Sequence, residues 1–299
     1  MTQPVPPSAP EPSRPPVWLP VAPVVFLLLW SGGFSFAKLG ILYAEPMTFL
    51  VLRYAVVLAL LLPVLLALRV ALPARPRDWL HIAFVGVLIQ AVYFGGSYIA
   101  FDLGISAGTS ALIVSLYPIL VALISPALTG ERIGLARWGG LALGLSGAAI
   151  VILARAAVEP PPVWALVAQA VPLFAITWAT LHEKRYGGTA HPVAASVIQY
   201  AAGFVAVLPF ALVLETMAVD WTGELAVSLA YLVVGNSIIG MILLITMIRH
   251  GEASRVSALF FLIPPTASIM AWGLLGEVMP PLAWVGLGVA AVGVWLARR

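Results

Sequence analysis

The fold is decided by a stretch that the chain contains twice. Residues 107–151 read AGTSALIVSLYPILVALISPALTGERIGLARWGGLALGLSGAAIV, and residues 253–297 read ASRVSALFFLIPPTASIMAWGLLGEVMPPLAWVGLGVAAVGVWLA. They align without a gap at one offset, the 146 positions that separate residue 107 from residue 253. Such self-similarity indicates a fold built from copies of one unit. Pairs at this offset include Pro118 and Pro264, Glu131 and Glu277, Trp138 and Trp284, and Gly147 and Gly293.

The same offset continues upstream of this stretch. One offset across three regions predicts two tandem copies of one unit. We expect a first repeat in residues 18–156 and a second in residues 157–299. Residues 1–17 are rich in proline and cannot bury a core, so we expect a disordered cytoplasmic tail there. The upstream pairs are Pro46 and Pro192, Tyr54 and Tyr200, and Pro63 and Pro209.

The composition indicates an integral membrane protein. Apolar residues make up 62% of the chain, charged residues 9%, and the mean hydropathy is +1.06. A soluble domain carries about 25% charged residues. The net charge of +3 lies in short loops and gives no reason to expect nucleic acid. The chain has no cysteine and no histidine pair with the spacing of a metal-binding helix, so we expect neither a metal nor a cofactor.

Ten apolar segments predict an all-α membrane protein with ten transmembrane helices. Most are near the roughly 20 residues that cross a bilayer as a helix. None shows the alternating polarity of a transmembrane β-strand. The segments are residues 18–38, 47–68, 79–101, 107–128, 135–154, 163–182, 191–214, 225–248, 253–274 and 281–297.

The loops predict the orientation, because cytoplasmic loops are enriched in Lys and Arg. The side opposite the N-terminal tail has only Lys38 and Arg155, and Arg53 lies inside the second segment. We therefore expect a multi-pass protein of the inner membrane with both termini in the cytoplasm. The tail side carries Arg14, Arg69, Arg75, Arg77, Arg132, Arg137, Lys184, Arg185, Arg249, Arg255, Arg298 and Arg299.

Five helices per repeat is an odd number, so the two repeats enter the membrane from opposite sides. Inverted repeats of this kind are typical of secondary transporters, whose substrate site lies near the midplane between the repeats. The pattern therefore favours a transporter that works by alternating access.

Polar residues within the apolar segments are the first candidates for the substrate site. Gln90 is paired with Asn236 by the repeat offset, and Ser31 is paired with Thr177. A side-chain amide that faces lipid leaves its hydrogen bonds unmade at a cost of several kcal/mol, so these groups must face the interior. One interpretation is a polar central cavity. The alternative is that the two amides bridge helices.

Aromatic residues supply further candidates. Tyr93 and Ser97 follow Gln90 at a spacing that puts all three on one helical face, and Tyr98 adjoins it. Three more aromatic residues lie within apolar segments, away from the membrane interfaces where tryptophan is usually enriched. They either stack on a flat substrate or serve ordinary packing. They are Trp30, Tyr117 and Trp178.

Prolines inside the fourth and ninth segments are candidate hinges. Pro118 in one copy corresponds to Pro264, next to Pro265, in the other. Proline in a helix interior removes a backbone hydrogen bond and bends the helix. The bends either move with a gate or are static packing kinks.

Two further motifs have structural interpretations. The run Gly144-Leu-Ser-Gly147 is similar to the nucleophile motif of rhomboid-type intramembrane proteases, but no histidine lies mid-membrane to act as the base. These glycines are more typical of close helix packing. Glu131 and Glu277 lie in or beside loops, which favours helix capping or pairing between loops.

The first repeat resembles the drug/metabolite transporter superfamily, and in particular its EamA-type members. The resemblance lies in Trp30-Ser-Gly-Gly-Phe34, Lys38, Pro46 and Arg53-Tyr54, with serine and tyrosine where the family usually has glycine and phenylalanine. The resemblance implies ten helices in two inverted repeats and export of metabolites. Within the family, the chain is most similar to YddG-type exporters of aromatic and other amino acids.

We therefore expect an exporter of small zwitterionic or aromatic metabolites, above all amino acids, with the substrate and the lipid bilayer as its partners. The alternative within transport is an exporter of drugs or organic cations, which a buried unpaired carboxylate would favour. An intramembrane enzyme is disfavoured by the missing base and metal ligands. A scaffold without transport leaves the paired buried polar residues unexplained.

Overall fold

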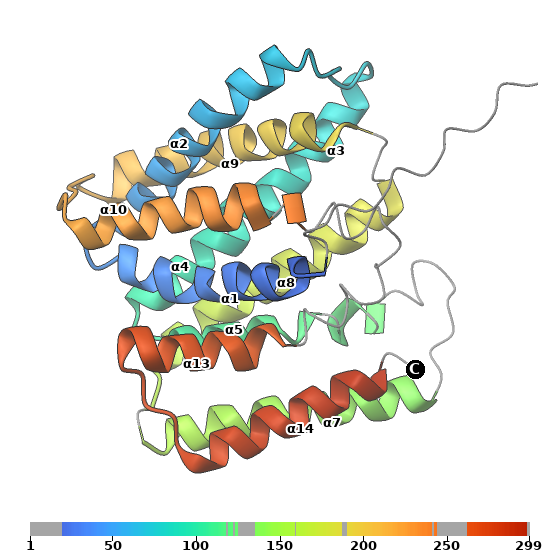
Figure 1. Cartoon of the computed structure of the whole chain (residues 1–299), viewed down its shortest axis with the longest axis vertical. Helices are drawn as coiled ribbons and strands as arrows, with labels where there is room; N and C mark the ends of the chain where they lie inside the picture. The colour runs from blue at the N-terminus through green and yellow to red at the C-terminus, as the bar shows by residue number, and fades with distance from the viewer. Residues whose placement is uncertain are drawn as a thin grey trace, which may run out of the picture.

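The computed structural model describes residues 20–117, 119–121, 123–124, 135–158, 160–186, 190–240, 242–243 and 262–297. In these residues the chain forms a layered stack of helices that run roughly side by side (Figure 1). The helices are α1 (Ala22–Gly40), α2 (Pro46–Ala67), α3 (Pro76–Gly86), η1 (Val87–Tyr93), α4 (Phe94–Asp102), α5 (Ala107–Val114), α7 (Leu135–Ala156), α8 (Val163–Tyr186), α9 (Pro192–Leu214), α10 (Gly223–Ala230), η2 (Tyr231–Gly240), α13 (Ile263–Leu275) and α14 (Pro281–Ala297).

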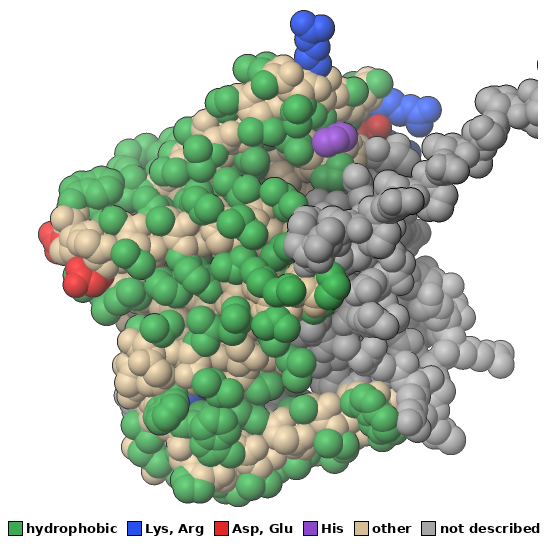
Figure 2. All heavy atoms as spheres, in the orientation of Figure 1, with side chains coloured by type: hydrophobic (Ala, Val, Ile, Leu, Met, Phe, Trp, Pro, Cys, Tyr) green, Lys and Arg blue, Asp and Glu red, His purple; other side chains and the backbone are tan. Residues whose placement is uncertain are grey.

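The length and composition of these helices confirm the all-α membrane fold. In the described part of the chain, seven helices are long and apolar enough to cross a membrane. One of them is the continuous run Pro76–Asp102, which joins α3, η1 and α4. Three shorter apolar helices bring the total to the ten segments expected from the sequence. On the described part of the face seen in Figure 2, hydrophobic side chains are spread over all the helices and the few visible charged side chains lie towards its edges, as lipid contact requires.

The two halves repeat the same helices at the same offset. Prolines begin α2 and α9, at the equivalent positions Pro46 and Pro192, where the missing N–H is not needed. The π-helical segments also correspond, because residues 87–93 map onto residues 233–239 inside η2. The π-helix is rare and is frequently found at functional sites. Each repeat therefore carries the same local departure from α-helix in its third span.

The largest buried cluster lies where the repeats meet. Phe49, Leu50 and Tyr54 of α2 pack there with Tyr98 of α4 and Tyr200 of α9. Each of these aromatic rings is almost fully enclosed, and Tyr54 and Tyr200 have ring centroids 5.6 Å apart. This core fixes α2 and α9 side by side, one from each repeat.

Helices α7 and α14 pack against each other as a separate pair at the lower edge of Figure 1. Glycines allow this contact. A methyl group added at Gly147 would lie 2.3 Å from the backbone nitrogen of Ala290, and one added at Gly293 would lie 2.2 Å from that of Gly144. The interpretation of these glycines as a packing face is confirmed. Ser146 donates only to the carbonyl of Ala142 in its own helix.

This packing predicts opposite effects for two glycines of α14. We expect Gly293→Ala to destabilise the protein by about 1–3 kcal/mol, the usual cost of overpacking, because the clash is with backbone. Gly288→Ala is the matched control, since a methyl group there meets nothing within 4 Å. It should be neutral or stabilising by up to about 1 kcal/mol through helix propensity. Thermal unfolding in detergent measures both, and equal melting temperatures would contradict the packing account.

Candidate substrate-binding site

A cavity of about 170 Å³ lies between the repeats. A smaller one of about 30 Å³ adjoins it and shares six of its residues, namely Trp30, Phe34, Arg53, Tyr93, Phe94 and Asn236. We refer to the two together as the central cavity. Its lining comes from α1, α2, η1, α4, α5, α8, α9, η2 and α13, so both repeats contribute.

Seven of the residues predicted from the sequence line this cavity. Five lie in the larger part and two, Ser97 and Tyr98, in the smaller part. The helical face predicted to carry Gln90, Tyr93 and Ser97 therefore does converge on one space. The five in the larger part are Trp30, Gln90, Tyr93, Tyr117 and Asn236.

Three predicted residues lie away from the cavity. Ser31 and Thr177 are buried but do not line it, and the Thr177 hydroxyl donates to the carbonyl of Leu173 in its own helix. Trp178 is 50% exposed. It follows Thr177 by one residue, a turn of about 100° around the helix, which places it on the outer face of α8.

Two of the prolines predicted as hinges, Pro264 and Pro265, were expected inside a helix and lie instead at the start of one. Pro264 lines the larger part of the central cavity, and both Pro264 and Pro265 lie in the first turn of α13. Proline is tolerated in that turn because the N–H groups there have no helical partner. Pro118 lies outside the described residues. A hinge role for the three prolines stays a prediction.

Asn236 connects the two repeats. Its Nδ2 donates to the carbonyl of Leu29 in α1 at 3.3 Å, and its Oδ1 accepts from Arg53 Nη2 at 3.3 Å. Gly33 leaves room for it, since a methyl group there would lie 2.7 Å from Asn236 Nδ2. The bridging interpretation of Asn236 is thus compatible with its place in the cavity wall.

Gln90 differs from Asn236 in its hydrogen bonds. Its backbone carbonyl accepts from the Tyr54 hydroxyl at 2.6 Å, but its side-chain Oε1 is buried without a hydrogen-bond partner. Buried acceptors are normally satisfied. Gln90 therefore offers an unused acceptor beside the cavity.

Arg53 was predicted only as a charge inside an apolar segment and as part of the family motif, and not as a site residue, although an ionisable residue at membrane depth favours a functional role. It lies in α2 and is 1% exposed. Its Nη1 donates to the Tyr98 hydroxyl at 3.1 Å, and its Nη2 donates to Ser237 Oγ at 3.1 Å as well as to Asn236.

These partners of Arg53 are all uncharged. The guanidinium carbon lies 4.6 Å from the centre of the Phe94 ring, and Nε makes no hydrogen bond. The ion pairs among the described residues join Glu277 to Lys38 and to Arg155, and none reaches Arg53. Within this part of the chain, Arg53 brings a positive charge to the central cavity without a carboxylate to balance it.

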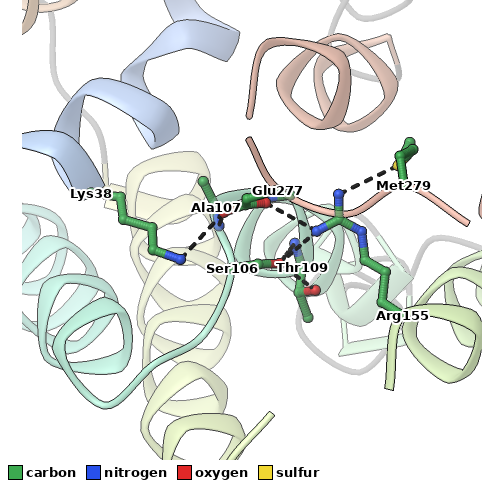
Figure 3. Close-up of polar contacts among 8 residues, drawn as sticks. Lys38, Ser106, Ala107, Thr109, Arg155, Glu277 and Met279 are labelled. Carbon is green, nitrogen blue, oxygen red and sulfur yellow. Dashed lines mark hydrogen bonds and ion pairs between the residues drawn. The ribbon is translucent and has the colours of Figure 1, made fainter. Parts of the chain in front are cut away.

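A second polar cluster lies at one end of the helix bundle, on the left in Figure 1. We call this end the distal face. Helices α1, α4 and α9 end there, and α5 and α10 begin there. Glu277 is at its centre, with Lys38 on one side and Arg155 on the other (Figure 3). Its carboxylate lies 3.3 Å from Lys38 Nζ and 3.0 Å from Arg155 Nη1. It also accepts from the backbone N–H groups of Ala107 and Gly108.

Glu277 therefore joins the second repeat to α1, α5 and α7 of the first. The prediction that it caps a helix or pairs between loops is confirmed, because Ala107 and Gly108 form the first turn of α5. Its relative Glu131 lies outside the described residues. Burial alone would raise the pKa of Glu277, but the Lys38 charge, the Arg155 hydrogen bond and the two N–H groups lower this pKa below its ordinary value.

A second set of hydrogen bonds joins the two repeats at the distal face. Glu215, after α9, accepts from the backbone N–H groups of Met47 and Thr48 at the start of α2, at 2.7 Å each. Glu45, before α2, accepts from the backbone N–H and hydroxyl of Thr216. Both repeats are thus joined across the distal face at two places.

Comparison with known proteins assigns the family. The EamA-like transporter family matches the chain twice, at residues 20–153 and 163–299. The chain belongs to this family, so it is a multi-pass membrane transporter and not an enzyme. The two matches fit the inverted repeats of the fold.

Several relatives agree with this assignment. A "probable terminal-alkyne amino-acid exporter" of Streptantibioticus cattleyicolor is 30% identical, over 75% of each chain. The inner membrane transporter YedA of Escherichia coli is 26% identical, over 93% of this chain and 90% of its own. The transporter YvbV of Bacillus subtilis is 26% identical over 80% and 77%. A crystal structure that is 21% identical superposes with a TM-score of 0.66 over 94% of this chain and 98% of that one, which supports the fold.

Proposed function

We propose that the chain is an inner-membrane secondary transporter that exports small zwitterionic metabolites, namely aromatic and other neutral amino acids, as YddG-type exporters do. The observation that carries this proposal is the central cavity between the repeats. Its walls combine aromatic rings with uncharged hydrogen-bonding groups, including Gln90 and Asn236. Such groups suit a solute that brings both of its own charges. The relative named as an amino-acid exporter adds support.

Transport would proceed by alternating access around this cavity. The Glu277 cluster and the Glu215 and Glu45 contacts hold the distal face shut. The Lys and Arg residues of the loops support the assignment of the distal face to the outside, with both termini in the cytoplasm. Export would then require these contacts to open after the substrate enters from the cytoplasmic side. Pro264, Pro265 and Pro118 are the proposed bends for this movement.

The alternative, an exporter of organic cations, has less support from the site. Among the described residues, those that line the central cavity include Arg53 and no Asp or Glu. A cation entering this space would meet a like charge in its wall, with no counter-ion among these residues. Like charges at short range in a low-dielectric site repel strongly.

Two substitutions separate binding from movement. Gln90→Ala should weaken amino-acid binding by about 0.5–1.5 kcal/mol, the worth of one neutral hydrogen bond. Pro264→Ala should slow transport more than it weakens binding, because its side chain offers no hydrogen bond to the substrate. Binding in detergent and flux in liposomes, measured on both variants, test this division. Normal transport by Pro264→Ala together with normal binding by Gln90→Ala would show that both assignments are wrong.

The function itself is tested by flux in proteoliposomes. The purified chain should move neutral and aromatic amino acids and should not move organic cations such as tetraphenylphosphonium or methyl viologen. Protein-free liposomes are the control for leak. Flux of the cations without flux of any amino acid would overturn the proposal in favour of the alternative.

A further inference from the structure

We propose that Arg53 is the anchor for the substrate carboxylate, so that the transporter selects its cargo by a carboxylate and not by an ammonium group. This inference rests on the proposed function, because it assigns the part of an amino acid that the central cavity recognises. It starts from the charge of Arg53, which has no carboxylate partner among the described residues.

The cost of this charge is the first argument. Arg53 lies seven residues beyond Pro46, about 10 Å along α2 from the distal end at 1.5 Å per residue. It is 1% exposed and therefore cut off from water. Charged groups at such depth are costly and occur in membrane proteins where they pair with another group or line a substrate pathway. A ligand carboxylate would supply the missing pair.

The hydrogen bonds of Arg53 do not supply a structural reason for the charge. Tyr98, Asn236 and Ser237 are neutral acceptors, and a neutral amide donor could bridge the same helices at lower cost. These contacts instead hold the guanidinium plane in place on the cavity wall, and Phe94 lies 4.6 Å away. The group is thus oriented before any ligand arrives.

The shape of the guanidinium fits a carboxylate. Its planar fork can donate two parallel hydrogen bonds to the two oxygens, and such charge-assisted pairs are about twice as strong as neutral ones. Arg53 Nε has no hydrogen-bond partner, so one donor is free for a carboxylate oxygen, and a second parallel bond from Nη2 would replace its neutral contact with Asn236 or Ser237. Lysine would keep the charge but would lose the fork.

Another unused polar atom in the wall of the central cavity is an acceptor and not a donor. Gln90 Oε1 is an acceptor without a donor, and Gln90 lines the same part of the cavity as Arg53. A carboxylate at Arg53 would leave the ammonium of an amino acid to use this oxygen. The side chain would then lie among the rings of Trp30, Phe34 and Tyr93. The unmatched donor and acceptor together correspond to the two ends of a zwitterion.

The inference is tested first on the unmodified protein with three ligands that share one ring. L-Phenylalanine has both charges, 3-phenylpropionate has only the carboxylate, and phenethylamine has only the ammonium. Binding to the full chain in detergent, measured by calorimetry, should be at least tenfold tighter for phenylalanine than for phenethylamine. 3-Phenylpropionate should also bind more tightly than phenethylamine, although less tightly than phenylalanine.

Variants of Arg53 provide the second test. Arg53→Gln should weaken the binding of both carboxylates at least tenfold and leave phenethylamine unchanged or slightly tighter. Arg53→Lys should restore part of the lost affinity, which a role in packing alone would not predict. Melting temperatures show whether each variant folds. If a variant does not fold, the comparison of the three ligands on the unmodified protein still tests the inference.

The outcomes distinguish this inference from the function on which it rests. If phenethylamine binds as tightly as phenylalanine, or if Arg53→Gln weakens all three ligands equally, the carboxylate anchor is wrong and amino-acid export is not. If neither carboxylate binds while organic cations do, both the anchor and the proposed function are overturned.

Discussion

Asn236→Asp is expected to reduce amino-acid transport by roughly 30-fold or more while the protein still folds. The change is nearly isosteric, and Asn236 Oδ1 already accepts from Arg53 Nη2 at 3.3 Å. An aspartate there would pair with the guanidinium and take the place of the substrate carboxylate. Breaking or occupying a buried charge pair typically costs about 2–5 kcal/mol in affinity, which corresponds to roughly 30- to 5,000-fold.

Asn236→Ala is the matched control for this prediction. It removes the hydrogen bonds of Asn236 with Arg53 and with the Leu29 carbonyl but places no carboxylate beside the guanidinium, so it should weaken binding far less than Asn236→Asp. Uptake of labelled phenylalanine into proteoliposomes and melting temperature, measured for both variants, test the difference. If Asn236→Asp transports as well as Asn236→Ala, no carboxylate binds at Arg53. If Asn236→Asp melts far below the parent protein, its loss of transport would reflect misfolding.

Glu277→Gln should release the distal face. This change removes the charge that pairs with Lys38 and Arg155, and it leaves the buried Arg155 without a counter-ion. Breaking a buried pair by removing one partner costs about 3–5 kcal/mol. The contacts from Glu277 to α1, α5 and α7 weaken together, so the repeats should separate more often at this end.

A single cysteine reports on this opening, because the natural chain has none. Ser97 lines the central cavity five residues before the end of α4, about 7 Å beneath the distal face. In Ser97→Cys, an impermeant maleimide applied from that face should react at least tenfold faster when Glu277→Gln is added. Glu224→Gln, an exposed carboxylate at the start of α10, is the control and should change nothing. Equal rates in all three proteins would rule out a closing role for Glu277.

Opening of the distal face, reported by the cysteine of Ser97→Cys, should increase as pH falls. The pKa of Glu277 is lowered in the fold, so its stabilising contacts are complete above the ordinary value of about 4.3 and are lost as pH falls through the lower folded value. The labelling rate of Ser97→Cys, divided at each pH by the rate of the same cysteine in the Glu277→Gln protein, should therefore be low at neutral pH and rise towards one as pH falls through the lowered pKa. The ratio is needed because the reactive thiolate itself becomes scarce in both proteins at low pH.

The sequence was sufficient for the architecture because the repeat is visible in it. The offset that joins Pro46 to Pro192 also joins the π-helical segments of Gln90 and Asn236, so the cavity could be placed between the repeats from the sequence. The departure from α-helix itself was not predictable, because π-helical hydrogen bonding depends on packing around the segment and not on residue type alone.

The site was predicted less completely, for reasons that particular residues show. Trp178 and Thr177 are neighbours in sequence, but only packing decides that one faces outward and the other inward. Glu277 was expected to cap or pair, yet its partners Ala107 and Arg155 are more than 100 residues away and only the folded chain brings them together. Arg53 was a candidate on sequence grounds, since a charged residue inside an apolar segment is itself unusual.

Counterflow of phenylalanine tests the central claim most directly, namely that one cavity moves amino acids between the two faces of the membrane. Proteoliposomes loaded with unlabelled phenylalanine are diluted into a trace of labelled phenylalanine, with no other gradient present. The account predicts that label accumulates transiently in liposomes with the parent protein, and that it does not accumulate with Asn236→Asp or in liposomes loaded with phenethylamine. Absence of counterflow in the parent protein, or equal counterflow with phenethylamine inside, would contradict it.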